Sequence, residues 1–249
     1  MRLAVLAPLT FVACSRRADE RVTTPVVVAP TASEVATASA SASSSASVAP
    51  APTFRAKASY GIVVAPPSVH VPVVYLHGMW ASPEDSCSFF EPAAAHVGPL
   101  VCPRGNLAPS AGGAWGGPLA AKRVHLDEAL KAATAYGALA DQGVLLGFSS
   151  GALFALELAQ HEPGRWPALV LMSMHLSTSA AALKAAKVRR LVLAAGEQDG
   201  SFAHLRALAT TLAAGGVSTR FVTLGKVGHH FAVDMETRMT EAIDWVRGD

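Results

Sequence analysis

Residues 147–151 read GFSSG, which places a serine between two glycines in the pattern Gly-x-Ser-x-Gly. The apolar run GVLL precedes this segment, and apolar residues at helical spacing follow it in ALFALELAQ. In a strand-to-helix turn of this kind the serine adopts a strained backbone conformation, and side chains at Gly147 and Gly151 would clash with the neighbouring chain. The pattern therefore predicts that Ser149 is a nucleophile raised on a tight turn, with a helix N-terminus behind it.

A nucleophilic serine needs a base to remove its proton, and that base is usually a histidine held in place by an acid. Both follow in the chain, the acid in GEQD and the histidine in VGHHF. We predict Asp199 as the acid because the chain has left the preceding apolar run there, and Glu197 is the alternative. We predict His229 as the base. His230 is the alternative base, and otherwise packs near or caps the last helix.

The elements that must position these residues alternate along the chain. Short apolar, β-branched runs predict strands within residues 60–66, 71–78, 98–103, 142–148, 167–174, 188–196 and 218–224. Helices are expected over residues 119–136, 150–161, 202–214 and 232–247. Because the strands are continuously apolar, the pattern indicates an α/β fold with three layers: a mostly parallel sheet with helices on both faces. Ligands of such sheets bind at the carboxyl ends of the strands, where GFSSG, GEQD and VGHHF all fall.

With these motifs in this order, the chain from about residue 70 resembles the α/β-hydrolase superfamily, specifically its small carboxylesterase- and thioesterase-like members. The resemblance implies that Ser149 is the nucleophile and that Asp199 and His229 complete a catalytic triad. The HG turn after VPVVYL matches the oxyanion loop of the family. It implies that the backbone amides of Met79 and Ser150 form the oxyanion hole.

Further residues near these motifs are candidates for the substrate pocket. His77, in the HG turn, is expected to orient the oxyanion loop by hydrogen bonding. Trp80, beside that loop, and Trp115, in a glycine-rich loop, are candidate walls. His175 and His230 are the remaining pocket candidates. Only thirteen residues separate Met174 from Val188, which predicts one short helix, no cap domain and an open site suited to soluble or exposed acyl esters.

The resemblance implies a serine hydrolase that cleaves carboxylic esters through an acyl-enzyme intermediate, with a small-molecule acyl ester as substrate and no cofactor. A peptidase or thioesterase with the same triad is the nearer alternative, and a non-catalytic, envelope-tethered binding protein is the more distant one. No metal-binding motif occurs. A net charge of +2 with 15% charged residues gives no indication of nucleic-acid binding.

The N-terminus predicts export. Residues 1–14 read as a signal peptide, and FVAC resembles a lipobox in which Cys14 becomes lipidated. Residues 15–57 are rich in Ala, Ser and Pro, which predicts a disordered linker before a hydrolase domain over residues 58–249. We expect a cell-envelope protein held at the membrane through its lipid anchor only, with Ser15 favouring the outer membrane. An ordinary cleaved signal would instead give a periplasmic or secreted protein.

With Cys14 lipidated, Cys87 and Cys102 remain as a pair in an oxidising compartment. A disulfide between them is expected, and two buried free thiols are the alternative. Their spacing fits no zinc pattern.

Overall fold

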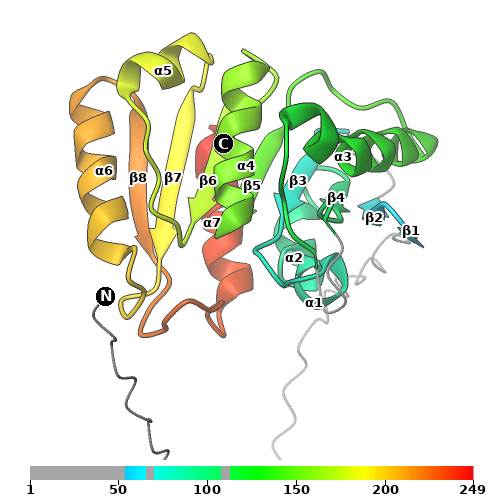
Figure 1. Ribbon diagram of the computed structural model, residues 1–249, viewed down its shortest axis with the longest axis horizontal. Coiled ribbons are helices and arrows are strands. Elements are labelled where there is room, and N and C mark those ends of the chain that lie inside the picture. Colours follow the sequence, from blue (N-terminus) through cyan, green and yellow to red (C-terminus); the bar gives the residue numbers. More distant parts are fainter. Residues whose placement is uncertain (1–53, 66–69, 108–112, 249) are drawn as a thin grey trace, which may run out of the picture. The chain divides into compact units, whose positions relative to one another are not determined.

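The computed structural model describes residues 54–65, 70–107 and 113–248. The predicted signal peptide, Cys14 and the linker up to residue 53 lie outside the described residues. Figure 1 shows the described domain as a sheet with helices packed against it. None of its helices is long and apolar enough to span a bilayer.

Eight strands form the sheet: β1 (Phe54–Ala58), β2 (Gly61–Ala65), β3 (Val73–Leu76), β4 (Leu100–Pro103), β5 (Val144–Phe148), β6 (Ala168–Met172), β7 (Arg190–Ala195) and β8 (Ser218–Thr223). Their order is β1-β2-β4-β3-β5-β6-β7-β8. From β4 to β8 all neighbours pair in parallel, whereas β2 is antiparallel to both β1 and β4. The mostly parallel sheet predicted from the sequence is thus confirmed.

The connections carry the helices: α1 (Pro83–Ser86), η1 (Cys87–Phe89), α2 (Glu91–Ala94), α3 (Leu119–Ala133), η2 (Thr134–Tyr136), α4 (Ser150–His161), α5 (Ala180–Ala185), α6 (Phe202–Ala214) and α7 (Met235–Arg247). One buried cluster lies between the sheet and α3, α4, α5 and α6. A second buried cluster, on the opposite face, lies between the sheet and α2 and α7. Strands buried on both faces explain why their sequences are continuously apolar.

Boundaries at both ends of the domain differ from the prediction. Phe54–Ala58 forms β1 and pairs with β2, so the predicted linker over residues 15–57 overlaps the folded domain. The last helix begins at Met235 rather than Ala232. Ala232 instead belongs to a turn, in which its carbonyl accepts a hydrogen bond from the Met235 amide (3.2 Å), and the apolar stripe of the helix starts only after that turn.

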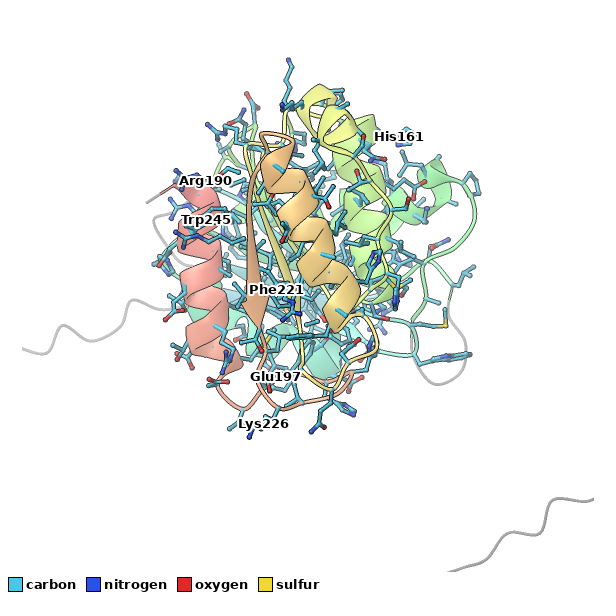
Figure 2. The ribbon with its side chains drawn as sticks, turned by 90° about the vertical axis from the view of Figure 1, so that its left-hand side faces the viewer. His161, Arg190, Glu197, Phe221, Lys226 and Trp245 are labelled. Carbon is cyan, nitrogen blue, oxygen red and sulfur yellow. A yellow bond between two sulfur atoms is a disulfide. The ribbon has the colours of Figure 1, made fainter. Side chains whose placement is uncertain are left out.

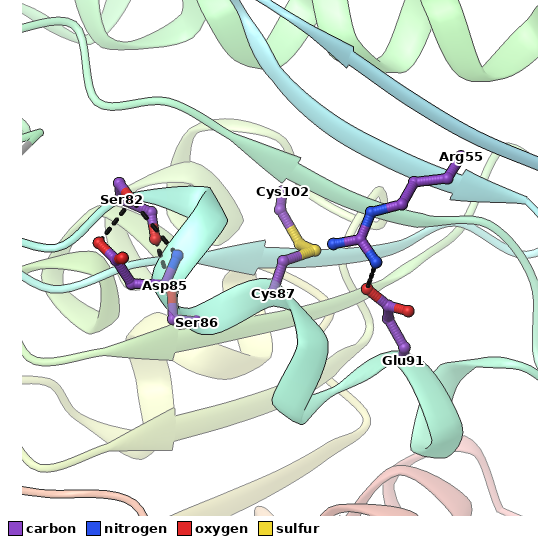
Figure 3. Close-up of a disulfide and its surroundings, with 7 residues drawn as sticks. All are labelled: Arg55, Ser82, Asp85, Ser86, Cys87, Glu91 and Cys102. Atoms are coloured by element: carbon purple, nitrogen blue, oxygen red, sulfur yellow. Dashed lines mark hydrogen bonds and ion pairs between the residues drawn. A yellow bond between two sulfur atoms is a disulfide. The ribbon is translucent and has the colours of Figure 1, made fainter.

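Cys87 and Cys102 form a disulfide between η1 and β4 (Figure 3). Both side chains are fully buried. Beside the disulfide, Arg55 of β1 forms an ion pair with Glu91 of α2 at 2.5 Å. The covalent link therefore holds the short helices after β3 against the sheet.

We expect reduction of this disulfide to lower the free energy of unfolding by about 3 kcal/mol, because it closes a loop with a sequence separation of 15 residues. Urea unfolding of the oxidised protein, compared with protein reduced while unfolded and then refolded in reductant, measures the difference. A Cys87→Ala/Cys102→Ala variant should unfold near the reduced protein. Coincident midpoints for the oxidised and reduced forms would contradict the prediction.

Candidate active site

Ser149 lies on the turn between β5 and α4, with φ 53° and ψ −123°. A backbone conformation with positive φ is costly for a residue with a side chain. A Cβ atom on Gly147 would come within 2.5 Å of the Gly151 carbonyl oxygen, and one on Gly151 within 2.0 Å of the Leu76 carbonyl oxygen. The Ser149 amide donates to the Met172 carbonyl at 2.9 Å. Close packing against two strands therefore fixes the strained turn, and both glycines are sterically required.

A chain of two hydrogen bonds joins Ser149 to residues far along the sequence. His229 Nε2 lies 3.0 Å from Ser149 Oγ, and His229 Nδ1 lies 2.8 Å from Asp199 Oδ2. Asp199 follows β7 and His229 follows β8, so both stand at the carboxyl edge of the sheet beside Ser149. The structure thus brings together the three side chains that the sequence singled out.

The Asp199 carboxylate is held from both sides. Its Oδ1 accepts hydrogen bonds from the Ser201 amide (2.8 Å) and the Ser201 hydroxyl (2.7 Å). Burial alone would raise the pKa of Asp199, but the hydrogen bonds from Ser201 and His229 outweigh burial and lower the pKa below its ordinary value. Asp199 therefore stays ionised and can hold the imidazole of His229 in one orientation.

The alternative acid and the alternative base are placed differently. The Thr223 hydroxyl, at the end of β8, donates a hydrogen bond to Glu197 Oε1 at 3.4 Å. In Figure 2, Glu197 lies near the loops at the lower end of the domain. The exposed His230 lines the cavity beside Ser149. In the described part of the chain, neither Glu197 nor the His230 side chain is hydrogen-bonded to the Ser149–His229–Asp199 chain.

The two residues predicted to supply the oxyanion amides, Ser150 and Met79, both lie near Ser149. Ser150 is the first residue of α4, so its amide has no acceptor within the helix. Met79 follows the HG turn after β3 and lines the same cavity as Ser149. The positive end of the α4 dipole lies at this point and favours negative charge there.

His77 is buried beneath this loop. Its Nε2 accepts a hydrogen bond from the Gly105 amide (2.9 Å), which leaves Nδ1 to carry the proton and donate to the Gly78 carbonyl (2.7 Å). Burial lowers the pKa of His77 and keeps the ring neutral. The ring therefore links the HG turn to the loop after β4 and serves as a structural support for the turn.

A cavity of about 230 Å³ opens beside Ser149 and His229. Its wall includes the aromatic rings of Tyr75, Phe148 and Phe231. None of these three residues was predicted from the sequence, although Phe148 and Phe231 stand directly beside the motif serine and histidines. That adjacency is the signal that could have indicated Phe148 and Phe231.

Of the five predicted pocket residues, His230 lines this cavity and His77 lies beneath the adjacent loop. Trp115 packs against the rings of His77 and Phe154 and donates its indole N–H to the His77 carbonyl (2.8 Å). Through this hydrogen bond the half-buried indole supports the loop from behind.

The other two predicted wall residues point elsewhere. Trp80 is 63% exposed and does not border the cavity. His175 is exposed and packs against the ring of His204, with ring centroids 4.9 Å apart. Neither side chain forms a wall beside Ser149.

A larger cavity, of about 380 Å³, lies at the amino ends of β5 and β6 and is lined by residues such as Val144, Ala168 and Arg189. Its lining contains none of the predicted site residues. Within the described residues, no group of three or more His, Cys, Asp or Glu side chains is arranged to hold a metal ion. The candidate site is therefore the smaller cavity beside Ser149.

No protein-family model and no curated protein matches the sequence, but solved structures match most of the chain. A carboxylesterase from Bacillus cereus superposes with a TM-score of 0.55 at 18% identity, covering 74% of this chain and 92% of that one. A fluorophosphonate-binding serine hydrolase F from Staphylococcus aureus gives 0.58 at 14%, covering 80% and 98%. A carboxylesterase from Mesorhizobium loti gives 0.57 at 17%, covering 78% and 99%. Sheet order, helix layers and these neighbours together show that the chain has the α/β-hydrolase fold.

Proposed function

We propose that the protein is a serine hydrolase that cleaves carboxylic esters, with Ser149 as nucleophile, His229 as general base and Asp199 as the acid that orients it. The observation that carries the proposal is the unbroken hydrogen-bond chain from Ser149 Oγ through His229 to Asp199, at 3.0 and 2.8 Å. The carboxylesterases and serine hydrolases among the structural neighbours support it.

In the proposed reaction, Ser149 Oγ attacks the ester carbonyl while His229 Nε2 takes its proton. The amides of Met79 and Ser150 stabilise the oxyanion, each contributing about 3 kcal/mol in sites of this type. When the tetrahedral intermediate collapses, the bond to the alcohol oxygen breaks and His229 returns the proton to the leaving alcohol. Water, deprotonated by His229, then attacks the acyl-Ser149 ester. The bond between the acyl carbon and Ser149 Oγ breaks, His229 returns the proton to Ser149 Oγ, and the carboxylic acid leaves.

The short segment after β6 supports an open site. Its helix, α5, has six residues, so this connection contains no cap domain. We propose that the substrates are dissolved or exposed small-molecule acyl esters. The chemistry needs no cofactor, because the serine, the histidine and the backbone amides supply every group that the two steps use.

A fluorophosphonate probe tests the proposal, because it forms a stable adduct with an activated serine. We expect stoichiometric labelling of the wild-type protein and complete loss of labelling in Ser149→Ala, with His230→Ala as the matched variant that still labels. Mass spectrometry of the intact protein reads the adduct. No labelling of folded wild-type protein would reject the hydrolase and favour a binding protein. Labelling combined with preferential turnover of thioesters or peptides would reject the ester assignment alone.

We also propose that the protein is exported, either lipid-anchored through Cys14, with the outer membrane favoured, or periplasmic or secreted. The buried Cys87–Cys102 disulfide supports an oxidising compartment. In this proposal the lipid is the only contact with the membrane, and nucleic acid is not a partner.

A further inference from the structure

A row of aromatic rings leads away from the proposed catalytic histidine. The ring centroids of His229 and Phe148 are 5.0 Å apart, and those of Phe148 and Phe231 are 4.8 Å apart. Phe231 in turn lies 4.9 Å from Phe89. Phe148 and Phe231 line the cavity, whereas Phe89 lies beyond it and is 42% exposed. We call Phe148, Phe231 and Phe89 the aromatic track.

The outer end of the track is firmly held. Phe89 is the last residue of η1, and Cys87 of the same turn is joined to β4 by the disulfide. The next residue, Phe90, is buried beneath the track, stacked on Tyr75 at 4.1 Å and in edge contact with Phe231 at 5.6 Å. The disulfide at Cys87 and the buried ring of Phe90 therefore fix the backbone of Phe89, while the ring of Phe89 is exposed to solvent.

An exposed ring at the end of a continuous apolar path costs free energy until something apolar covers it. The cavity itself, at about 230 Å³, is smaller than the roughly 300–1,000 Å³ of pockets that enclose drug-sized ligands. An extended group bound at Ser149 would therefore leave the cavity, and along the aromatic track it would stay in contact with apolar surface.

From this arrangement, and resting on the proposed ester hydrolysis, we infer that the substrate is an ester with an extended apolar substituent that runs along Phe148 and Phe231 and covers Phe89. Phe89 is then a specificity-determining residue. It contacts the far end of the substituent and leaves the reaction at Ser149 unchanged. Short esters do not reach it, so their turnover does not depend on it.

Two series of dissolved esters test this inference. The acyl series compares p-nitrophenyl acetate with p-nitrophenyl hexanoate, and the alcohol series compares ethyl acetate with hexyl acetate. In each series the ratio of kcat/KM for the long ester to that for the short ester is measured in four proteins: wild type, Phe89→Ala, Phe89→Leu and the control Val124→Ala. Val124 is exposed on α3, which covers the other face of the sheet.

We expect the ratio to fall about tenfold in Phe89→Ala in one of the two series, since each methylene group buried against protein is worth about fourfold. The series that responds tells whether the substituent belongs to the acyl or the alcohol part. Phe89→Leu, which keeps apolar bulk, should stay within about twofold of wild type, as should Val124→Ala. Turnover of the short esters should be the same in all four proteins.

Unchanged ratios in both series would overturn the inference while leaving the hydrolase proposal intact. A parallel loss of short-ester turnover in Phe89→Ala would also overturn it, because that result indicates a disturbed fold or reaction centre and not a lost contact with the substituent. If the wild-type protein hydrolysed no ester and took up no fluorophosphonate, the proposed function would fail, and this inference with it.

Discussion

Replacing His229 with alanine is expected to lower kcat for p-nitrophenyl acetate by about 10⁵- to 10⁶-fold, because Ser149 then has no base within reach. The neighbouring His230→Ala should stay within tenfold of wild type. Both histidines are exposed and border the same cavity, but only the ring of His229 lies between Ser149 Oγ and Asp199 Oδ2. Steady-state kinetics on the two purified variants measure the difference.

A double variant sharpens this prediction. If Ser149 and His229 act as one unit, Ser149→Ala/His229→Ala should be about as slow as either single variant, because the second substitution removes nothing that the first has left working. Losses that multiply would indicate two independent roles. A large loss in His230→Ala, with near-normal turnover in His229→Ala, would reverse the assignment of the base.

Much of this fold could be predicted because its strands and helices follow local patterns. The strand before Ser149 is continuously apolar, and the helix after it begins and ends at the predicted residues, Ser150 and His161. Five strand–helix alternations leave few topologies other than a parallel sheet. In such a sheet the segments that follow the parallel strands meet at one edge. The order of the motifs along the chain was therefore enough to predict that Asp199 and His229 lie beside Ser149.

The first strand could not be predicted in this way. Phe54–Ala58 reads FRAKA, with two cations in five residues and no β-branched side chain. It becomes a strand through its antiparallel pairing with β2 and the ion pair between Arg55 and Glu91. Both partners lie outside the segment, so its own composition contains no sign of either.

Adjacency to the motifs could have indicated Phe148 and Phe231 as wall residues, but local patterns could not exclude Trp115, because side-chain direction depends on packing across the domain. Trp115 was a reasonable wall candidate from its place in a glycine-rich loop. Its indole N–H finds its acceptor at the His77 carbonyl, which turns the ring toward Phe154 and away from the cavity. Phe231 forms part of the cavity wall instead. Its ring is held there by edge contact with Phe90, which lies more than a hundred residues earlier in the chain.

Replacing Gly151 with alanine shows whether helix propensity or packing against β3 decides which residue is tolerated in the turn after Ser149. Helix propensity alone predicts that the change stabilises α4 by about 1 kcal/mol. The structure predicts the opposite sign, because the new Cβ would lie 2.0 Å from the Leu76 carbonyl oxygen and 2.6 Å from that of His77. Neither backbone atom can move without shifting the end of β3 and the HG turn. We expect a loss of more than about 4 kcal/mol in the free energy of unfolding.

Gly200→Ala is the matched control, because a Cβ there meets nothing within 4 Å. Urea unfolding of the two variants beside wild type measures both changes, and the control should remain within about 0.5 kcal/mol. If Gly151→Ala were as stable as wild type and still took up the fluorophosphonate, α4 would have to be able to move away from β3. The strained conformation of Ser149 would then depend on something other than the close packing at Gly147 and Gly151. The steric explanation of the two glycines in GFSSG would be wrong.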